Sequence, residues 1–457
     1  MRILWVCHEY LGSDLDQTTQ MEMLDALARS GNVVHLLVPY CDARFVSEHI
    51  RSLPAVRWKY LSSLTFCMIM MFYLPLFAKK KRIEVVLVDS ASIFGTILVA
   101  LLPRFSIFLD IRSPPKRDEL AGMRGLVIDL QYRLSLRFAK HICAGITVVS
   151  EQLKIDICRQ FRIRHDFVGI WTSGVSTRLF VPDRDGSRRE NLRKSLGFSG
   201  GFVLMYHGTL EARRGVRETI EALNALKVRC PNLRFLVLGA GPEESGLRRM
   251  IEQLRLEDRV AMLGRVDYKV VPDYLSVCDV GIFAFPIYGW WRASSPLKLL
   301  EYLAMEKPVI ASDLPFNREV IEQGECGILI QSNNPAEMSN AIERLYQNPE
   351  LLESMGKKGR EFVERNHTWE AKAANLEDFL RARLNRRADR HRSATEVLNR
   401  KHSLFLVGLR RMDDSSDQRR DGRDYQSEAS TYFSIEKLPK ARQSNVRLDP
   451  RRLMGRA

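Results

Sequence analysis

The sequence has little of what marks metal-binding, secreted or disulfide-stabilised proteins. Its eight cysteines are scattered over 457 residues, and no two of them have the Cys-x-x-Cys spacing. This distribution argues against a zinc site and against a disulfide framework. We therefore expect no metal, and we interpret the cysteines as small buried hydrophobic residues in a reducing compartment.

Long apolar segments are also scarce. The run after Met1 is too short for the core of a secretory signal, and we expect no signal peptide. The segment 64–78, LTFCMIMMFYLPLFA, is shorter than the roughly 20 residues needed to cross a bilayer, and Pro75 interrupts it. We expect a buried or interfacial helix. The basic run from Lys79 to Arg82 fits anionic lipid headgroups or a solvated helix end.

The net charge of +15 is unevenly distributed. Residues 381–457 hold 20 Lys and Arg against 10 Asp and Glu, so this tail carries +10 of the excess. Its mixed polar composition predicts disorder. A solvated tail, contact with an anionic membrane and contact with nucleic acid are the alternatives, and nucleic acid is the least expected partner.

Up to about residue 380, apolar strands alternate with helical patterns. The first series begins with Arg2 to His8 and Val33 to Pro39, and a second series begins at Gly201. Because the strands are continuously apolar, they indicate parallel sheets covered on both faces. The sequence therefore predicts an α/β fold with two units of the same kind. The predicted divisions are 1–182, a linker at 183–200, 201–365, a terminal helix at 366–380 and the tail at 381–457.

The stretch 294–308, SSPLKLLEYLAMEKP, indicates a helix with an unusual charge order. Ser295 is a suitable N-cap, and Pro296 suits the first helical position. Lys298 and Glu301 share a face, but a cation in the first turn opposes the helix dipole. That order makes sense if a phosphate binds at the helix start and the carboxylate holds hydroxyl groups. A solvated ion pair on an amphipathic helix is the alternative.

Three further loops follow predicted strands, at the edge where open α/β sheets bind ligands. The loop from Gly208 to Gly215 offers backbone N–H groups and two arginines, which suits a diphosphate. Gly239 begins a second loop that allows close approach. The loop from Tyr10 to Asp14 contains only Gly12 and is a weak phosphate signal.

The order of these motifs resembles a known family. It runs VLMYHGTL…RRG, LRFLVLGAGPE, DRVAMLGRV, YLSVCDVGIFAFP, SSPLKLLEYLAMEKPVIASD and GILI. This order resembles the C-terminal half of retaining glycosyltransferases of the GT-B fold, the family-4 type known as glycosyl transferases group 1. The segments MRILWVCHEY, ITVVSEQLK and SGVSTRLFVP resemble the N-terminal half. The resemblance covers about residues 1–380.

The resemblance implies two Rossmann-like domains facing a central cleft. A nucleoside-diphosphate sugar binds mainly to the second domain, and a glycan or a polyprenyl- or other lipid-linked acceptor binds to the first. No metal or cofactor is required, and anomeric configuration is retained. The expected setting is the cytoplasm, with peripheral contact at the inner face of the membrane, in polysaccharide or glycolipid synthesis.

The resemblance also implies roles for individual residues. Arg214 matches the family's lysine before a loop glycine and should face the diphosphate. Glu301 matches the second Glu of the family's Glu-x7-Glu pattern and should hold the ribose hydroxyls. The expected catalytic residues are Arg214, Lys298 and Asp110. The expected donor-binding residues are Gly12, Gly208, Thr209, Arg213, Gly239, Pro296, Leu297 and Glu301.

The sequence departs from the family pattern at three positions. The family's first Glu falls at Ala293, and the arginine after its loop glycine is Thr209. Lys298 or Arg213 is the hypothetical source of the lost charge. A histidine at a strand end is replaced by Asp110, which either contacts the acceptor or caps a turn.

Two other features have two interpretations each. His207 follows a strand and either touches the donor or has a structural role. Trp290 and Trp291 precede the helix with the unusual charge order, and they either stack on a ligand or pack in the core.

Several functions therefore stay open. They are a sugar transferase, a nucleotide-sugar epimerase or phosphorylase on the same fold, and a binding protein with a degenerate donor site. A tail that binds nucleic acid is a further reading.

Overall fold

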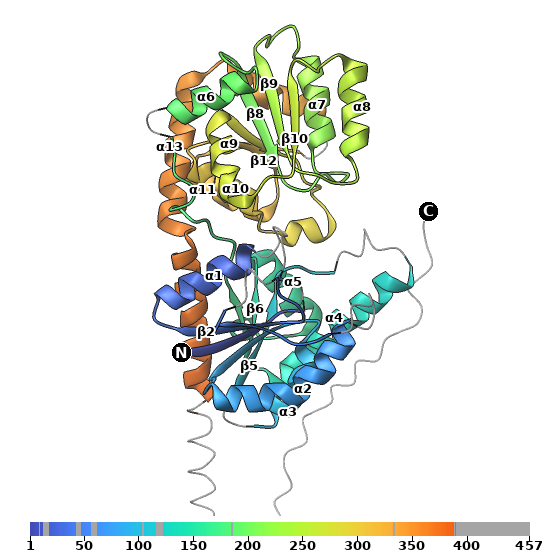
Figure 1. Cartoon of the computed structure of the whole chain (residues 1–457), viewed down its shortest axis with the longest axis vertical. Helices are drawn as coiled ribbons and strands as arrows, with labels where there is room; N and C mark the ends of the chain where they lie inside the picture. The colour runs from blue at the N-terminus through green and yellow to red at the C-terminus, as the bar shows by residue number, and fades with distance from the viewer. Residues whose placement is uncertain are drawn as a thin grey trace, which may run out of the picture. The chain divides into compact units, whose positions relative to one another are not determined.

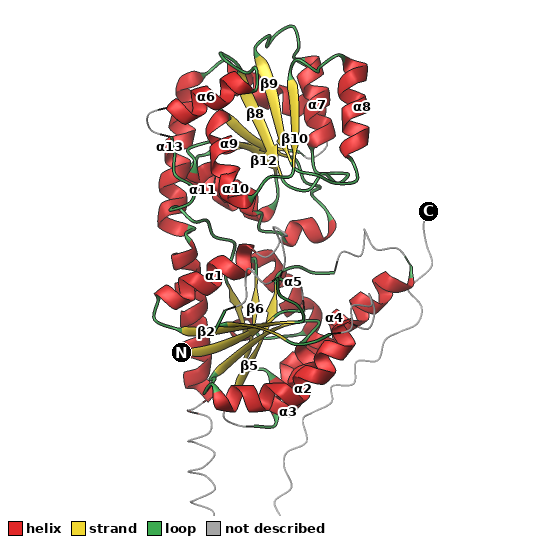
Figure 2. Cartoon of the chain, in the orientation of Figure 1, coloured by secondary structure: helices red, strands yellow, loops and turns green. Residues whose placement is uncertain are grey.

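The protein folds into two α/β lobes, each built on a parallel sheet (Figures 1 and 2). The computed structural model describes residues 1–8, 10–11, 18–42, 47–55, 62–102, 105–115, 122–183, 186–331, 334–387 and 389. Gly12 and the tail from residue 390 lie outside these residues, so the predictions for them stay untested.

The N-terminal lobe holds a seven-stranded parallel sheet in the order β3-β2-β1-β4-β5-β6-β7. The strand order reverses between β1 and β4, which is where open α/β sheets form a ligand crevice. Its strands are β1 (Arg2–Val6), β2 (Val33–Val38), β3 (Ile50–Ser52), β4 (Val85–Asp89), β5 (Ser106–Ile111), β6 (Gly145–Val148) and β7 (Val168–Ile170).

Both faces of this sheet are covered. Leu4 and Val6 of β1 belong to the core under α2, α4 and α5, whereas Ile3 and Trp5 belong to the core under α1 and a final helix, 369–387. Successive side chains of β1 point to opposite faces of the sheet and so pack in two different cores. The helical segments are α1 (Thr18–Arg29), α2 (Ser62–Lys80), η3 (Ile93–Thr96), α3 (Ile97–Ala100), α4 (Met123–Ile142), α5 (Glu151–Phe161) and η4 (His165–Phe167).

The C-terminal lobe holds a six-stranded parallel sheet in the order β10-β9-β8-β11-β12-β13. Its strands are β8 (Phe202–His207), β9 (Leu233–Leu238), β10 (Val260–Gly264), β11 (Val280–Phe283), β12 (Val309–Ser312) and β13 (Gly327–Ile330). Its helical segments are α6 (Ser187–Ser195), α7 (Val216–Ala225), α8 (Glu244–Leu254), η5 (Tyr268–Val270), α9 (Val271–Val277), η6 (Gly289–Ala293), α10 (Leu297–Ala304), α11 (Pro315–Gly324), α12 (Pro335–Tyr346) and α13 (Pro349–Asn366).

Most predicted strands are present within one or two residues, and the structure adds detail at two of the predicted boundaries. The expected linker 183–200 contains α6, which Arg193 fixes to the C-terminal lobe through Val277 O at 2.7 Å and Asp279 Oδ2 at 2.7 Å. The final helix continues to residue 387, beyond the predicted end at 380. The sequence reading also missed β3 and α11. The eight cysteines are free, and seven of them are buried, as predicted.

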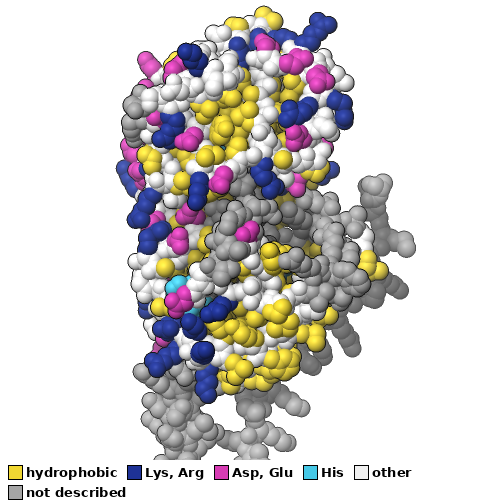
Figure 3. Space-filling view, viewed as in Figure 1, with side chains coloured by type: hydrophobic (Ala, Val, Ile, Leu, Met, Phe, Trp, Pro, Cys, Tyr) yellow, Lys and Arg dark blue, Asp and Glu magenta, His cyan; other side chains and the backbone are white. Residues whose placement is uncertain are grey.

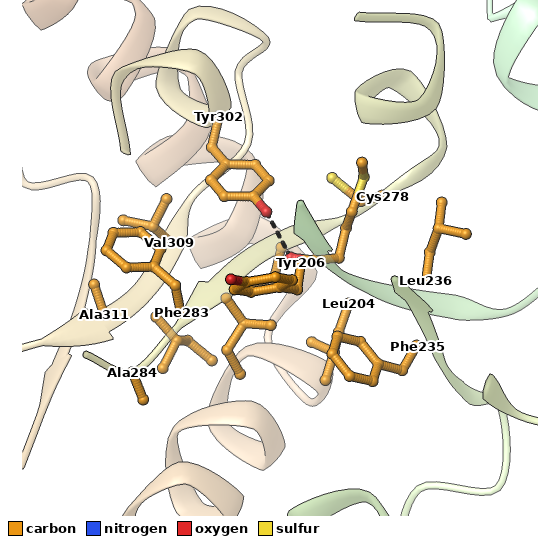
Figure 4. Packing of buried hydrophobic residues seen from close by; sticks show 14 of the residues in the cluster. Leu204, Tyr206, Phe235, Leu236, Cys278, Phe283, Ala284, Tyr302, Val309 and Ala311 are labelled. Carbon is orange, nitrogen blue, oxygen red and sulfur yellow. Dashed lines mark hydrogen bonds between the residues drawn. The ribbon is translucent and has the colours of Figure 1, made fainter. Parts of the chain in front are cut away.

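One tyrosine fixes the helix that the sequence singled out. Tyr302 of α10 donates its hydroxyl to Met205 O at 2.8 Å, and Figure 4 shows the Tyr302 ring in the packed interior. Its ring covers Gly281 of β11, where an added Cβ would lie 2.3 Å from the ring. The glycine therefore lets α10 approach the sheet closely. This contact holds the first turn of α10 at the end of the strands.

Candidate functional site

A cavity of about 490 Å³ lies where the two lobes meet, at the carboxyl ends of the strands. The C-terminal lobe supplies the loops after β8 and β9 and the start of α10, and the N-terminal lobe supplies the loop after β5 and the start of α1. Arg214 and Glu301 both line it, as the predicted donor site requires. The other predicted residues on its wall are Gly208, Thr209, Gly239, Pro296, Leu297 and Lys298.

The start of α10 differs from the prediction in its cap. Pro296, in an extended conformation, is the N-cap, and α10 begins at Leu297 without a side-chain cap. Ser295 instead holds the other lobe, since its Oγ accepts from Ser173 N at 3.1 Å and its carbonyl accepts from Ser173 Oγ at 2.6 Å. The first N–H groups of α10 therefore have no side-chain cap, and the first residues of the helix line the cavity.

Glu301 is buried, so the solvated ion pair considered as an alternative is ruled out. Its side chain is 3% exposed, and its Oε1 accepts a hydrogen bond from Tyr268 Oη at 2.7 Å. Burial raises the pKa of Glu301 to about 7, although the Tyr268 hydroxyl and the Lys298 ammonium favour its charged form. The carboxylate is thus held in place, and it is poised between its two protonation states at neutral pH.

Lys298 extends over aromatic rings rather than into water. Its Nζ lies 4.1 Å from the centroid of the Tyr206 ring and 5.1 Å from that of Phe285. Burial and the nearby Arg214 lower the pKa of Lys298 well below its ordinary value. A negatively charged ligand in the cavity would offset both effects and favour the ammonium form.

Arg214 is held by one carboxylate and two rings. Its Nη2 donates to Glu211 Oε2 at 2.6 Å, and its guanidinium carbon lies 4.7 Å from the Trp291 centroid and 5.4 Å from that of Phe285. Its Nε is buried without a hydrogen-bond partner among the described residues. A buried N–H donor without a partner is costly, so this atom is suited to an incoming acceptor.

Two glycines bring the phosphate-type loops together. An added Cβ at Gly239 would lie 1.8 Å from Gly208 O, and one at Gly208 would lie 2.8 Å from Lys298 Nζ. Both have positive φ, at 129° for Gly208 and 145° for Gly239. Only glycine fits at these positions, as the close-approach interpretation of Gly239 predicted.

His207 is a buried neutral imidazole. Burial, with a contribution from Lys298, lowers its pKa well below the ordinary value. Its Nε2 lies 3.3 Å from Glu301 Oε2, yet no hydrogen-bond geometry joins the two atoms. His207 lines the cavity and so can touch a ligand directly.

The packing role considered for the paired tryptophans is confirmed for Trp291, and stacking on a ligand stays a prediction. Their rings stack at 3.9 Å, and Trp291 is buried against Phe285 at 4.6 Å. Trp290 is half-buried, and both line the cavity. Trp291 therefore packs under Arg214, while Trp290 forms part of the cavity wall.

Two predicted site residues do not reach the cavity. Asp110 is 3% exposed within the sheet, where Oδ1 accepts from Thr147 Oγ1 at 2.6 Å and from Trp171 Nε1 at 3.0 Å. Arg213 is exposed, and its Nη1 donates to Tyr288 Oη at 2.8 Å. Neither residue is on the cavity wall, and the predicted catalytic role of Asp110 and donor-binding role of Arg213 stay predictions. Asp110 has a structural position, and Arg213 faces outward.

Some lining residues were missed by the sequence reading. Arg265 and Tyr268 follow β10, and Gln20 lies in the first turn of α1 with a buried Oε1 that has no partner among the described residues. Arg112, noted only as a neighbour of Asp110, stacks 3.5 Å from the Trp171 centroid and lines the cavity. The strand-end rule that selected Gly208 also applies to the loop after β10.

No group of three or more His, Cys, Asp and Glu side chains in the described part of the chain is arranged to hold a metal ion. The charged side chains of the cavity wall are instead four cations, Arg112, Arg214, Arg265 and Lys298, and one carboxylate, Glu301. Such a wall favours an anion that also carries hydroxyl groups.

Comparison with known proteins agrees with this picture. Residues 188–362 match the family model described as Glycosyl transferases group 1. An alpha-D-kanosaminyltransferase of Streptomyces kanamyceticus is 27% identical over 221 residues, which cover 48% of this chain and 55% of that protein. A GDP-mannose-dependent alpha-(1-6)-phosphatidylinositol monomannoside mannosyltransferase of Mycobacterium tuberculosis is 27% identical over 212 residues, which cover 46% and 54%. The chain spans about half the length of these relatives.

Among solved structures, Anabaena Alr3699/HepE in complex with UDP is similar in fold. Its TM-score is 0.67 at 16% identity, and the match covers 84% of this chain and 100% of that one. The predicted fold class, two parallel-sheet α/β domains of the GT-B type, is confirmed.

Proposed function

We propose that the protein is a glycosyltransferase that moves a sugar from a nucleoside-diphosphate sugar to a glycan or lipid-linked acceptor with retention of anomeric configuration. One observation carries the proposal. Arg214, Lys298, the uncapped start of α10 and the buried Glu301 line a single cavity. Cations and free N–H groups suit a diphosphate, and a carboxylate suits ribose hydroxyls. The family match over residues 188–362 supports this assignment.

In the proposed reaction, the diphosphate lies between Arg214 and Lys298. Breaking the bond from the sugar to the diphosphate builds negative charge on the leaving phosphate. Preorganised cations and helix N–H groups stabilise that charge, and their removal typically costs about 10²–10³ in rate. The ammonium form of Lys298 gains most, because its pKa is depressed before the anion arrives. No cofactor is invoked for this step.

A neighbouring pocket suits the acceptor. It has a volume of about 520 Å³ and is lined from α4, α5 and η6, with Asp129, Asp156 and Trp290 among its polar and aromatic residues. Trp290 also lines the donor cavity, so the two spaces share a wall. Carboxylates and an indole ring suit a sugar acceptor, whose hydroxyl groups donate hydrogen bonds and whose ring carbons pack on an aromatic side chain.

The proposed setting is polysaccharide or glycolipid synthesis in the cytoplasm, at the inner face of the membrane. The name of the mycobacterial relative includes phosphatidylinositol monomannoside, a glycolipid, and this supports a lipid-linked acceptor here.

One observation favours a second candidate, a nucleotide-sugar-binding protein without transfer activity. The position of the family's first Glu is Ala293, which is 3% exposed on the cavity wall, so no carboxylate stands there. Ala293 O accepts from Ser150 Oγ at 2.8 Å, which shows that the backbone is fixed without it. This candidate and an epimerase both predict donor binding without transfer.

The test is a thermal-shift screen against UDP, GDP, ADP and dTDP and their sugar derivatives, followed by transfer assays. A ligand present at 100 times its Kd stabilises the fold by about 2.7 kcal/mol. A donor that raises Tm and is consumed only with acceptor, with product anomers assigned by NMR, supports the proposal. Donor binding without acceptor-dependent turnover supports a binding protein, and conversion of donor alone supports an epimerase.

A further inference from the structure

Helix α2 is apolar on two opposite faces. Phe66, Met70 and Leu74 are 0% exposed and pack in the core of the N-terminal lobe. The other face carries a stripe with a four-residue period, whose members are 56–73% exposed: Leu64, Met68, Phe72 and Leu76. A helix on the surface of a lobe needs one apolar face for its core, so the second face is unexplained by folding.

The same kind of surface continues on α3 and α4, which cover the same face of the sheet as α2. The additional exposed apolar residues are Ile97, Leu101 and Leu102 on and after α3, and Met123, Leu126, Val127, Leu130 and Leu134 on α4. Figure 3 shows hydrophobic side chains gathered at this edge of the lobe, with Lys and Arg side chains beside them. We call the stripes of the three helices the apolar face.

Both long stripes end in cations. One turn after Leu76, α2 ends in the exposed Lys79 and Lys80. The stripe of α4 continues from Leu134 to the exposed Arg137 and His141. A pocket of about 290 Å³ beside this end of α4 is lined by Arg133, Arg137, Lys140, His141 and Arg162, among other residues. Apolar side chains and cations therefore occur together on helices that cover the same face of the sheet.

We propose that the apolar face docks the protein on an anionic lipid bilayer. The apolar side chains enter the boundary between headgroups and acyl chains, and the cationic helix ends meet lipid phosphates. Charge complementarity favours lipid over a second copy of this chain. Helix α2 has no acidic residue, and the only acidic residue of α4, Asp129, pairs with Arg133 at 2.8 Å. A second copy would present no carboxylates from this face to the cations.

The structure favours surface contact over spanning. Within the described residues, α2 is the one helix long and apolar enough to cross a membrane, with a mean hydropathy of 1.4. However, Phe66, Met70 and Leu74 already pack against the sheet, and Pro75 lies within the helix. Crossing a bilayer would strip this core from the lobe, whereas lying on the bilayer keeps it.

Docking of the apolar face on a bilayer would bring a lipid-anchored acceptor close to the proposed acceptor pocket. This step rests on the proposed function. Asp129 and Tyr132 of α4 line the proposed acceptor pocket, while Leu126 and Leu130 of the same helix belong to the apolar face. One helix thus separates the bilayer from the pocket. An acceptor anchored in the bilayer would need to cross only the width of α4 to place its sugar in the pocket.

The test is co-sedimentation of the full chain with vesicles of phosphatidylcholine alone or with 25% phosphatidylglycerol. The wild type should bind the anionic vesicles, with weaker binding at high salt. Phe72→Glu together with Leu126→Glu should reduce the partition coefficient at least about tenfold, because two large apolar side chains leave the interface. Val228→Glu is the matched control, since Val228 is 90% exposed on the C-terminal lobe.

Several results would overturn the proposal. They are absence of vesicle binding by the wild type, equal loss in the Val228→Glu variant, and full binding by the double variant. A wild-type dimer that becomes a monomer in the double variant, without vesicle binding in either, would assign the face to a second copy. The UDP-induced thermal shift of each variant is measured in parallel. A variant that keeps the UDP-induced thermal shift but loses vesicle binding is impaired in membrane docking and not in nucleotide binding. The two measurements therefore test the docking inference and the proposed function separately.

Discussion

Arg214 and Lys298 approach the same aromatic ring. Their charged groups lie 5.4 and 5.1 Å from the centroid of Phe285, although one comes from the loop after β8 and the other from α10. Two cations gathered in a half-buried place repel each other, which contributes to the lowered pKa of Lys298 after burial itself. Holding these two cations close together costs free energy when the cavity contains no anion, and it becomes favourable when a doubly charged anion binds between them.

The first prediction concerns these two cations. Arg214→Ala and Lys298→Ala should each lower kcat/KM for the donor by about 10²–10³, since each removes charge stabilisation from the leaving group. Arg213→Ala is the matched control, because Arg213 is exposed and bonded to Tyr288 outside the cavity. Its rate should stay within about threefold of the wild type. Initial rates measure kcat/KM for the donor, and UDP titrations measure the affinity for the diphosphate part of the donor.

The same series decides where the charge lost at Thr209 comes from. If Arg213→Ala reduces turnover as much as Lys298→Ala, Arg213 turns into the cavity during the reaction. If the double variant of Arg213 and Lys298 keeps the wild-type rate, neither residue replaces the family's arginine, and the phosphate assignment fails.

The second prediction is a pH dependence of stability. The pKa of Glu301 is raised to about 7 by burial, from an ordinary value of 4.5. Between these pH values the folded state holds a proton that the unfolded state has lost. The unfolding free energy therefore falls as pH rises from 4.5 to about 7, by about 3 kcal/mol from this group, and is level on either side.

Glu301→Gln removes this dependence while its amide oxygen can still accept from Tyr268. The difference in unfolding free energy between wild type and variant should decrease with pH across that interval, as followed by urea denaturation at several pH values. A difference that stays constant from pH 4.5 to 8 would mean that Glu301 titrates normally and that the carboxylate is better solvated than its 3% exposure indicates.

The third prediction separates structure from catalysis at Asp110. Asp110→Ala leaves the Thr147 hydroxyl and the Trp171 indole N–H without their acceptor. Each orphaned buried donor costs roughly 1–3 kcal/mol, so the fold should lose a few kcal/mol. UDP affinity at a temperature where the variant is folded should be unchanged. Asp110→Asn, which keeps an acceptor oxygen, should recover much of the stability. An asparagine variant that is stable yet inactive would restore a chemical role for Asp110.

Most of the predicted donor residues line one cavity because strand ends and the loops after them can be predicted from local sequence patterns. Continuous apolar strands predicted the parallel sheets, and parallel sheets place all their carboxyl ends at one edge. Gly208, Gly239 and the start of α10 therefore had to be neighbours of a ligand crevice. Lys298 precedes Glu301 in the helix, which opposes the helix dipole. This order indicated that the two side chains interact with a ligand or with other protein groups and not only with water.

Local sequence patterns could not predict which side chains point into the cavity. Arg213 has a φ of 66°, and this left-handed residue turns the chain so that Arg213 points outward while Arg214 enters the cavity. Asp110 lies one residue before the end of β5 and faces β6, whereas Arg112, just beyond the strand, reaches the cavity. The bond from Tyr268 to Glu301 joins residues 33 apart, and no periodic pattern links them.

The last prediction concerns the contact between the two glycine loops. Gly239 has a φ of 145°, and an added Cβ would lie 1.8 Å from Gly208 O, which is a backbone atom and cannot move without shifting the loop. Gly239→Ala should therefore separate the loops after β8 and β9, lower Tm, and weaken UDP binding by about tenfold or more.

Gly246→Ala provides the matched control, because Gly246 lies in α8 with Arg217 Nη2 at 3.5 Å as its nearest neighbour. In a helix, alanine in place of glycine stabilises by roughly 0.5–1 kcal/mol, so this variant should gain stability and bind UDP normally. Isothermal titration and thermal denaturation of both variants measure the contrast. Normal UDP affinity in Gly239→Ala would show that the loop after β9 does not shape the phosphate site, and the donor would then rest on Arg214, Lys298 and α10 alone.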